Sequence, residues 1–184
     1  NIIIDCHITP GNIHDSEPYI DRLNQIEKNF GFIANKVALD SGYYSLDILK
    51  QLDKRGVFSV IGYRRFSKAK DTKYYKYIQE KDIFVDIRTG EIFEYKNIAR
   101  NGYKEYRSAD KTEKKKIRRH IDAQHYDLAK IRRLSKEGKA LYKRRKQTIE
   151  RSFADSKQNH GYRYAQYRGK AKVQSYAWLS CCVQ

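Results

Sequence analysis

The stretch KVALDSGYYSLDILKQLDKRGVFSVIG, residues 36–62, contains a complete strand–helix–strand pattern. Lys36–Asp40 is a short apolar strand that ends on a carboxylate, and Val57–Gly62 is a second apolar strand. Between them, Ser45 is a typical cap for a helix with leucines at helical spacing, and Gly56 ends that helix. Strands and helices that alternate over such short connections indicate an α/β fold.

The segment before this pattern is expected to contain one more strand and one more helix. Ile2–Ile8 is apolar and predicts a strand, and TPGNIHDS (9–16) is a turn. Asp15 or Ser16 is expected to cap a helix that runs to about Asn29 and is ended by Phe30 and Gly31. Because the chain begins at Asn1 with a strand that has no preceding partner, we expect it to be a fragment.

The pattern changes after residue 62. DIFVDIRTGEIFEY (82–95) predicts a hairpin with Thr89 and Gly90 at its turn, residues 103–116 have no clear period, and residues 117–135 predict a basic helix. A long helix is expected from Gly138 to Asn159, and another over Val173–Val183. The predicted organisation is therefore a first part of the core (1–62), an insertion (63–140) and two C-terminal helices (141–184).

Charge is distributed unevenly along the chain. The net charge is +17, yet residues 1–60 carry six Lys and Arg against eight Asp and Glu, whereas residues 61–184 carry 33 against 14. Such asymmetry, interleaved with tyrosines, favours nucleic acid as a partner over a merely solvated basic surface. No glycine-rich phosphate loop, apolar span or secretory signal is present, and the three cysteines have no metal-binding spacing. We therefore expect no nucleotide cofactor and no membrane, and a cytoplasmic location.

Glu150 stands out because it is one of only two acidic residues after Gly138. Ile149 and Phe153 share a helical stripe that is expected to face the core, and Glu150 lies at the margin of that stripe. A buried carboxylate needs a partner. It either forms a salt bridge with Arg151, Lys146 or Lys157, or binds a metal ion together with a second carboxylate.

Asp40 is the candidate for that second carboxylate. It ends a buried strand, and ligands of open α/β sheets gather at the carboxyl ends of strands. Asp40 is alternatively a simple helix cap or turn residue. Together, Asp40 and Glu150 offer hard oxygen ligands that suit Mg²⁺, and two such ions can catalyse displacement at phosphate.

Asp40 and Glu150 each lie in a motif that connects the chain to a known family. ALDSGYYS (38–45) resembles the second-aspartate motif of DDE insertion-sequence transposases, and RKQTIERSFADSKQNHGYRYAQYRG (145–169) resembles their glutamate motif. ITPGNIHDS (8–16) and GYKEYRS (102–108) also resemble segments of that family. The resemblance covers nearly the whole chain.

The resemblance implies an RNase H-like mixed sheet flanked by helices, with an inserted β-hairpin and helical segment between the second Asp and the Glu. It also implies DNA cleavage and strand transfer by two Mg²⁺ or Mn²⁺ ions, with Asp40 and Glu150 as catalytic metal ligands. The first catalytic Asp of the family would lie on a strand before this chain, so two of three acids are present and Asp5 is not the third. A bacterial, nucleoid-associated protein that acts as a homodimer on transposon ends and target DNA is expected.

The same resemblance assigns DNA contacts to basic and aromatic residues around the glutamate. Lys157 follows Glu150 by seven residues, as in the family, whereas Arg145 stands one residue farther from Glu150 than in the family's Tyr–Arg pair. The residues expected to contact DNA are Tyr142, Arg145, Lys157, His160, Arg163 and Arg168. His160 is alternatively a plain helix-end residue, and Arg163 and Arg168 are alternatively part of a solvated basic face.

Three functions remain open from the sequence. The first is a truncated transposase catalytic domain, the second is a non-catalytic DNA-binding relic of a transposase, and the third is another RNase H-like nuclease. Metal-dependent nicking separates the second from the other two, and dependence on terminal repeats separates the first from the third.

Overall fold

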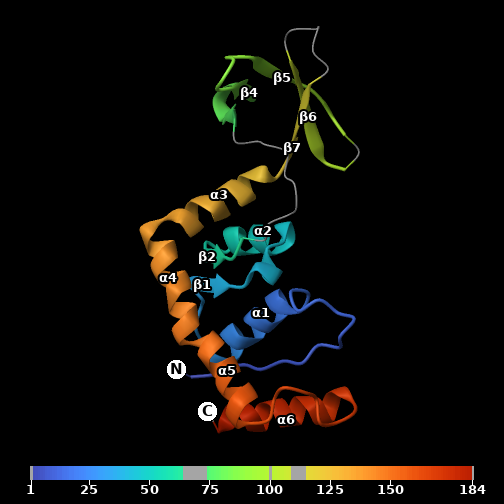
Figure 1. Ribbon diagram of the computed structural model, residues 1–184, viewed down its shortest axis with the longest axis vertical. Helices are drawn as coiled ribbons and strands as arrows, with labels where there is room; N and C mark the ends of the chain where they lie inside the picture. Colours follow the sequence, from blue (N-terminus) through green and yellow to red (C-terminus); the bar gives the residue numbers. More distant parts are fainter. Residues whose placement is uncertain (1, 64–73, 100, 109–114, 184) are drawn as a thin grey trace. The chain divides into compact units, whose positions relative to one another are not determined.

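The computed structural model describes residues 2–63, 74–99, 101–108 and 115–183. The chain divides into two compact units (Figure 1). One joins residues 1–64 to residues 128–184, and the other comprises residues 65–127. The three-part division expected from the sequence stays a prediction.

A parallel pair of strands forms the centre of the first unit. β1 (Lys36–Leu39) pairs with β2 (Phe58–Ile61), with Leu39 opposite Ile61. The connecting helix α2 (Leu46–Lys54) is capped by Ser45, whose hydroxyl accepts the Ile48 N–H at 3.4 Å. Helix and strands bury Ile48, Leu49, Leu52, Val57, Val60 and Ile61. The predicted strand–helix–strand pattern is confirmed.

The helix α1 (Tyr19–Phe30) ends as predicted, but it is not capped by the residues that the sequence suggested. It ends at Gly31, whose φ of 68° lies in the left-handed region that glycine adopts most readily. Its N-cap residue is Pro18, which makes no side-chain capping hydrogen bond. Asp15 instead accepts a hydrogen bond from the Thr9 hydroxyl at 2.8 Å, and Ser16 contacts His14, so both candidate caps are engaged within the preceding turn.

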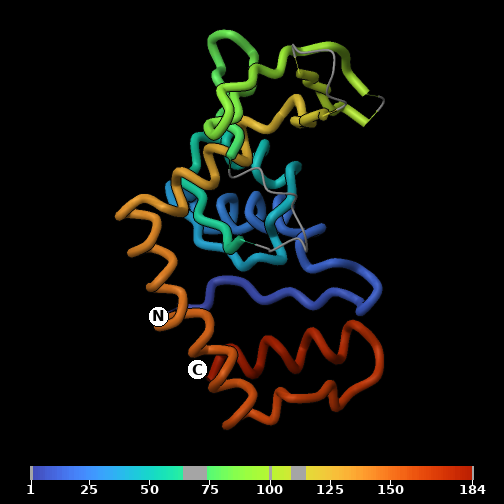
Figure 2. Tube along the Cα trace, turned by 45° about the horizontal axis from the view of Figure 1, so that its top comes forward, coloured from blue at the N-terminus to red at the C-terminus, as the bar shows by residue number. Residues whose placement is uncertain are grey.

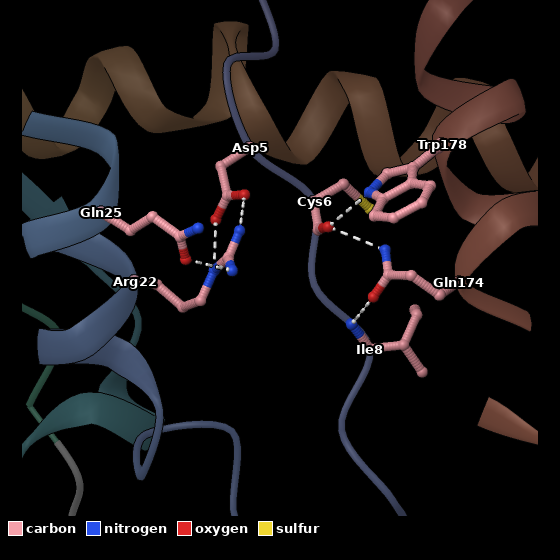
Figure 3. Close-up of polar contacts among 7 residues, drawn as sticks. All are labelled: Asp5, Cys6, Ile8, Arg22, Gln25, Gln174 and Trp178. Carbon is pink, nitrogen blue, oxygen red and sulfur yellow. Dashed lines mark hydrogen bonds and ion pairs between the residues drawn. The ribbon is translucent and has the colours of Figure 1, made fainter. Parts of the chain in front are cut away.

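Residues 2–9 form no strand, contrary to expectation, and are held by side chains instead. The Gln174 amide donates to the Cys6 carbonyl at 2.8 Å and accepts the Ile8 N–H at 2.9 Å (Figure 3). The Trp178 indole also donates to the Cys6 carbonyl, at 3.1 Å, and Asp5 pairs with Arg22 of α1. The segment therefore runs beside the last helix, α6 (Lys170–Cys182), more than 160 residues away in the sequence (Figure 2).

Two helices that meet at Ser135 contact the centre of the first unit. In the first, α3 (Ala123–Leu134), Arg132 donates to Asp53 at 2.6 Å and to the Ser59 hydroxyl of β2 at 3.2 Å. The second, α4 (Lys136–Gln147), packs against both strands. The turn between them requires Gly138, because a Cβ there would lie 1.9 Å from the Arg132 carbonyl oxygen.

The long helix expected from Gly138 to Asn159 is two helices. α4 stops at Gln147, Thr148 has φ −114° and ψ −96°, and α5 (Ile149–Asn159) begins directly after it. The expected inward orientation of α5 is also wrong, because Ile149 is 41% exposed and Phe153 is 56% exposed. α5 buries Ser156 instead. The terminal helix expected from Val173 begins earlier, at Lys170.

The described residues of the second unit form a five-stranded antiparallel sheet in the order of the chain. Its strands are β3 (Tyr75–Ile78), β4 (Ile83–Asp86), β5 (Ile92–Ile98), β6 (Tyr103–Ser108) and β7 (Lys116–His120). The predicted hairpin at Thr89 and Gly90 is confirmed as β4 and β5. The basic helix expected over 117–135 is wrong in its first part, where β7 buries Ile117.

Aromatic side chains make the core of this sheet. Phe84, Phe93 and Tyr106 are buried with Ile117, and Tyr75 and Tyr77 pack against them. Tyr75 and Tyr77 therefore contribute to the packing of this sheet.

The described residues combine a small parallel sheet and its helices with an antiparallel sheet, which is a mixed α/β architecture compatible with an RNase H-like fold. The expected fold class is confirmed. Among these residues, no helix has both the length and the apolar character required to span a membrane.

Candidate functional site

Asp40 lies at the carboxyl end of β1, as the sequence predicted. Its side chain accepts the Ser41 N–H at 2.7 Å and so caps a short 3₁₀ turn, Ser41–Tyr43. This contact fulfils the turn-forming interpretation of Asp40. The side chain nevertheless stays 60% exposed, so the same carboxylate is accessible to a further ligand.

Glu150 lies in the first turn of α5, where the helix dipole favours a negative charge. Its side chain is 47% exposed, so it does not point into the core as expected. Its ion-pair partner is Arg145, at 3.8 Å between Arg145 Nη2 and Glu150 Oε1. The partners considered from the sequence were Arg151, Lys146 and Lys157, and Arg145 was not among them.

The break at Thr148 explains this pairing. In a continuous α-helix, residues five apart lie about 140° apart around the axis, so Arg145 and Glu150 would face different directions. The break changes the direction of the chain between them and places both side chains at one site. The Thr148 hydroxyl donates to the carbonyl oxygens of Arg144 at 3.1 Å and Arg145 at 3.3 Å. These bonds hold the end of α4 at the break.

Arg145 contacts both candidate carboxylates. Its Nη1 lies 3.5 Å from Asp40 Oδ1, and its side chain is only 14% exposed. The Tyr142 hydroxyl lies 3.4 Å from Nη1, and the guanidinium carbon lies 5.5 Å from the centre of the Tyr142 ring. Asp40, directly after the strand β1, and Glu150, from the helix α5, therefore share one cation from α4.

Gly62 permits the close approach of Tyr142 to this site. A Cβ at Gly62 would lie 2.6 Å from the Tyr142 hydroxyl and 2.9 Å from the Ser41 backbone nitrogen. The residue following β2 must therefore lack a side chain. The sequence identified Gly62 only as the end of a strand, since the contact with Tyr142 joins positions 80 residues apart.

The carboxylates open into a hollow of about 880 Å³. Its lining combines acidic, basic and aromatic side chains: Asp40, Arg145, Glu150, Phe153, Ala154, Lys157, Gln158, Arg163 and Tyr164. Two exposed aromatic residues, Phe153 and Tyr164, were not predicted as site residues. For Tyr164 the sequence signal was the tyrosine- and arginine-rich stretch after α5, whereas Phe153 lies within α5 and was assigned to its core-facing stripe.

The structure brings most of the sequence-predicted site residues together. Asp40, Arg145, Glu150, Lys157 and Arg163 line this hollow, and Tyr142 contacts Arg145. His160 and Arg168 are not in its lining. His160 ends α5, with Nε2 3.2 Å from Asp155 Oδ2 and its carbonyl accepting the Tyr176 hydroxyl at 2.7 Å, which is the geometry of a helix-end residue.

The donor set is suited to a divalent cation. Two exposed carboxylates on different elements already share a positive guanidinium, so their arrangement attracts a cation to the space between them. Within the described part of the chain, no group of three or more His, Cys, Asp and Glu side chains is placed to hold a metal ion. Asp40 and Glu150 are therefore one acid short of the three that the resemblance implies.

Paired carboxylates on an α/β frame, surrounded by Lys and Arg, are typical of proteins that act on the phosphate backbone of nucleic acids. The chain matches the family model described as transposase DDE domain over residues 1–184, and it belongs to that family. No curated protein and no solved structure matches it. Family membership supports a transposase function in general, with DNA as the partner and divalent metal ions as the usual cofactors of the family.

Proposed function

We propose that this protein cleaves and rejoins DNA at the ends of an insertion sequence, with Asp40 and Glu150 as ligands for Mg²⁺ or Mn²⁺. The observation that carries the proposal is that one guanidinium, that of Arg145, contacts both carboxylates at the edge of a hollow with further cations. When bound, two divalent ions would supply activation of the attacking oxygen and stabilisation of the leaving oxygen.

The chain's own residues have distinct roles in this proposal. Lys157 and Arg163 are held together at the hollow, where Arg163 Nε donates to the Lys157 carbonyl oxygen at 3.4 Å. Their positive charges would hold the phosphates on each side of the scissile bond. Phe153 and Tyr164 are 56% and 82% exposed and offer flat surfaces on which unpaired bases near a DNA end can stack.

Strand transfer at two ends of one element requires two such sites, so the active form in this proposal is a homodimer on DNA. Mass measurement by light scattering, with and without a DNA end, tests this part separately. A monomer in both conditions would contradict it.

The experiment for the catalytic proposal is cleavage of a labelled linear DNA that carries the element's terminal repeats, in Mn²⁺ or Mg²⁺. In a version of the protein that also supplies the family's first catalytic Asp, we expect nicking, and a loss of at least about a hundredfold for Asp40→Asn and Glu150→Gln, since each removes a metal ligand. Glu94→Gln is the matched control, because Glu94 is an exposed carboxylate on β5.

The outcomes separate the alternative functions. DNA binding without nicking would favour a non-catalytic DNA-binding protein. Equal nicking of scrambled ends would favour another RNase H-like nuclease. Equal nicking by Asp40→Asn and wild type would contradict the assignment of the site.

A further inference from the structure

We infer that Arg145 is a resident counter-cation, which occupies the place of the divalent ion between Asp40 and Glu150 and is displaced when that ion binds. This inference rests on the proposed function of the two carboxylates as metal ligands. It adds a role for Arg145 other than contact with DNA.

The contacts of Arg145 support this role. Its two terminal nitrogens divide between the carboxylates, Nη1 toward Asp40 at 3.5 Å and Nη2 toward Glu150 at 3.8 Å. Arg145 is the least exposed of the three side chains, at 14% against 60% for Asp40 and 47% for Glu150. The guanidinium is therefore the most buried member of this cluster, and its contacts with both carboxylates compensate their mutual repulsion.

The contacts are also loose enough to be exchanged. Both distances are near the upper limit for an ion pair. The two terminal nitrogens also contact different carboxylates, so they do not form the strong bidentate pair in which both bind one carboxylate. A divalent ion carries twice the charge and binds carboxylate oxygens at shorter distance. It is therefore expected to displace Arg145 from the carboxylates.

The displaced guanidinium has a second set of ligands available. Arg145 lines the same hollow as Lys157 and Arg163, where DNA phosphates would lie in the proposed function. Guanidinium matches phosphate geometry well. A phosphate that attracts Arg145 would free the carboxylates and so tighten metal binding. Because linkage is reciprocal, bound metal would tighten phosphate binding by the same factor. Arg145 would thus couple occupancy of the metal site to the presence of DNA.

The test is calorimetric titration of Mn²⁺ into the full chain without DNA. Arg145→Gln removes the competing cation and is expected to bind Mn²⁺ at least about fivefold more tightly than wild type, since a unit charge within 4 Å of a cation site weakens binding by that order. Arg145→Lys keeps the charge but contacts fewer oxygens at once, so a smaller increase is expected.

Arg163→Gln is the matched control, because Arg163 lines the same hollow and loses the same charge. We expect it to change Mn²⁺ affinity less than twofold. Equal tightening by Arg145→Gln and Arg163→Gln would show a general charge effect and overturn the inference. Weaker binding by Arg145→Gln would also overturn it, because Arg145 would then be positioning the ligands rather than competing with the metal.

Two further variants distinguish failure of this inference from failure of the proposed function. Asp40→Asn and Glu150→Gln should each abolish Mn²⁺ binding if the carboxylates are ligands. Unchanged binding in both would reject the proposed ligands, whatever Arg145→Gln does. If Arg145→Gln lowers the melting temperature strongly, Arg145→Lys decides: affinity equal to or below that of wild type would overturn the counter-cation role.

Discussion

Arg145 Nη2 lies 3.8 Å from Glu150 Oε1, although the two residues are five positions apart and belong to different helices. The contact exists because α4 ends at Gln147 and α5 starts at Ile149, with the chain broken at Thr148 between them. The same guanidinium reaches Asp40 at the end of β1. One interrupted helix and one strand end thus create the candidate site, and several consequences of this geometry can be measured.

Thr148→Ala is expected to weaken Mn²⁺ binding severalfold. It removes the hydroxyl that donates to the Arg144 and Arg145 carbonyl oxygens, and alanine favours a continuous helix that would turn Glu150 away from the site that it shares with Asp40. Thr148→Ser keeps the hydroxyl and should bind Mn²⁺ like wild type. Equal affinity in Thr148→Ala and Thr148→Ser would show that the break does not depend on this hydroxyl.

Gly62→Ala is expected to weaken Mn²⁺ binding although Gly62 is not itself a proposed metal ligand. The new Cβ would meet the Tyr142 hydroxyl at 2.6 Å and the Ser41 nitrogen at 2.9 Å, so Tyr142, Ser41 or both must move. We expect about 1–3 kcal/mol less free energy of unfolding and weaker Mn²⁺ binding. Urea unfolding and Mn²⁺ titration measure the two effects.

Gly11→Ala is the control for this substitution, because a Cβ at Gly11 would have no neighbour within 4 Å among the residues that the structure describes. It should leave both quantities nearly unchanged. A Gly62→Ala protein with normal stability and normal Mn²⁺ affinity would contradict the role given to the close approach of Tyr142.

Gln174→Ala is expected to destabilise the first unit. The substitution removes both hydrogen bonds from the side chain to residues 6 and 8, and leaves a backbone carbonyl and N–H without this partner. The expected loss is about 1–3 kcal/mol in the free energy of unfolding. Gln158→Ala, at an exposed position on α5, is the control and should cost less than about 0.5 kcal/mol.

The fluorescence of the single tryptophan provides the measurement for Gln174→Ala. Trp178 lies on α6 and donates to the Cys6 carbonyl at 3.1 Å, so its environment reports on the same segment. If Gln174→Ala and the control Gln158→Ala unfold at the same urea midpoint, the anchoring of residues 2–9 by Gln174 is contradicted.

The stability of the second unit is expected to fall between about pH 4 and about pH 2 because of Asp82. Burial tends to raise the pKa of this carboxyl, but hydrogen bonds from Lys104, Tyr77 and Tyr106 outweigh it and lower the pKa from 3.8 to about 2. A carboxyl with a lowered folded-state pKa stabilises the fold above its unfolded-state pKa, and this contribution is lost as pH falls through the folded-state pKa.

Calorimetric melting of wild type and Asp82→Asn from pH 6 to pH 2 isolates this contribution. Asn tolerates the left-handed backbone of residue 82, which has φ 50°, and it does not ionise. Other carboxyls titrate in both proteins, so their effects cancel in the difference. We expect the gap in melting temperature to be largest near pH 6 and to shrink below pH 4. A gap that does not vary with pH would contradict the assignment.

Local patterns predicted much of the first unit. Ser45 as a cap, Gly31 as a helix end and the apolar runs of β1 and β2 depend on neighbouring residues, and they are found as expected. The position of Asp40 at a strand end follows from the same patterns. The family resemblance was carried by these local motifs and is confirmed by the family match over the whole chain.

The errors arose where distant residues decide the structure. Residues 2–8 have the composition of a strand, but Gln174 makes backbone contacts that a neighbouring strand would make. The sequence has no Gly or Pro near Thr148 that would indicate a helix end, so one continuous helix was predicted through this position. Residues 117–120 were assigned to a helix because they are rich in basic residues, whereas they pair with β6 and bury Ile117 on one face.

The most direct measurement of the central claim is an anomalous difference map from crystals of this protein soaked in Mn²⁺, compared with metal-free crystals. The account predicts a Mn²⁺ peak about 2.1 Å from carboxylate oxygens of both Asp40 and Glu150, with the Arg145 guanidinium moved away from them. Arg145 unchanged between the two carboxylates at saturating Mn²⁺, with no peak beside Asp40 or Glu150, would contradict it.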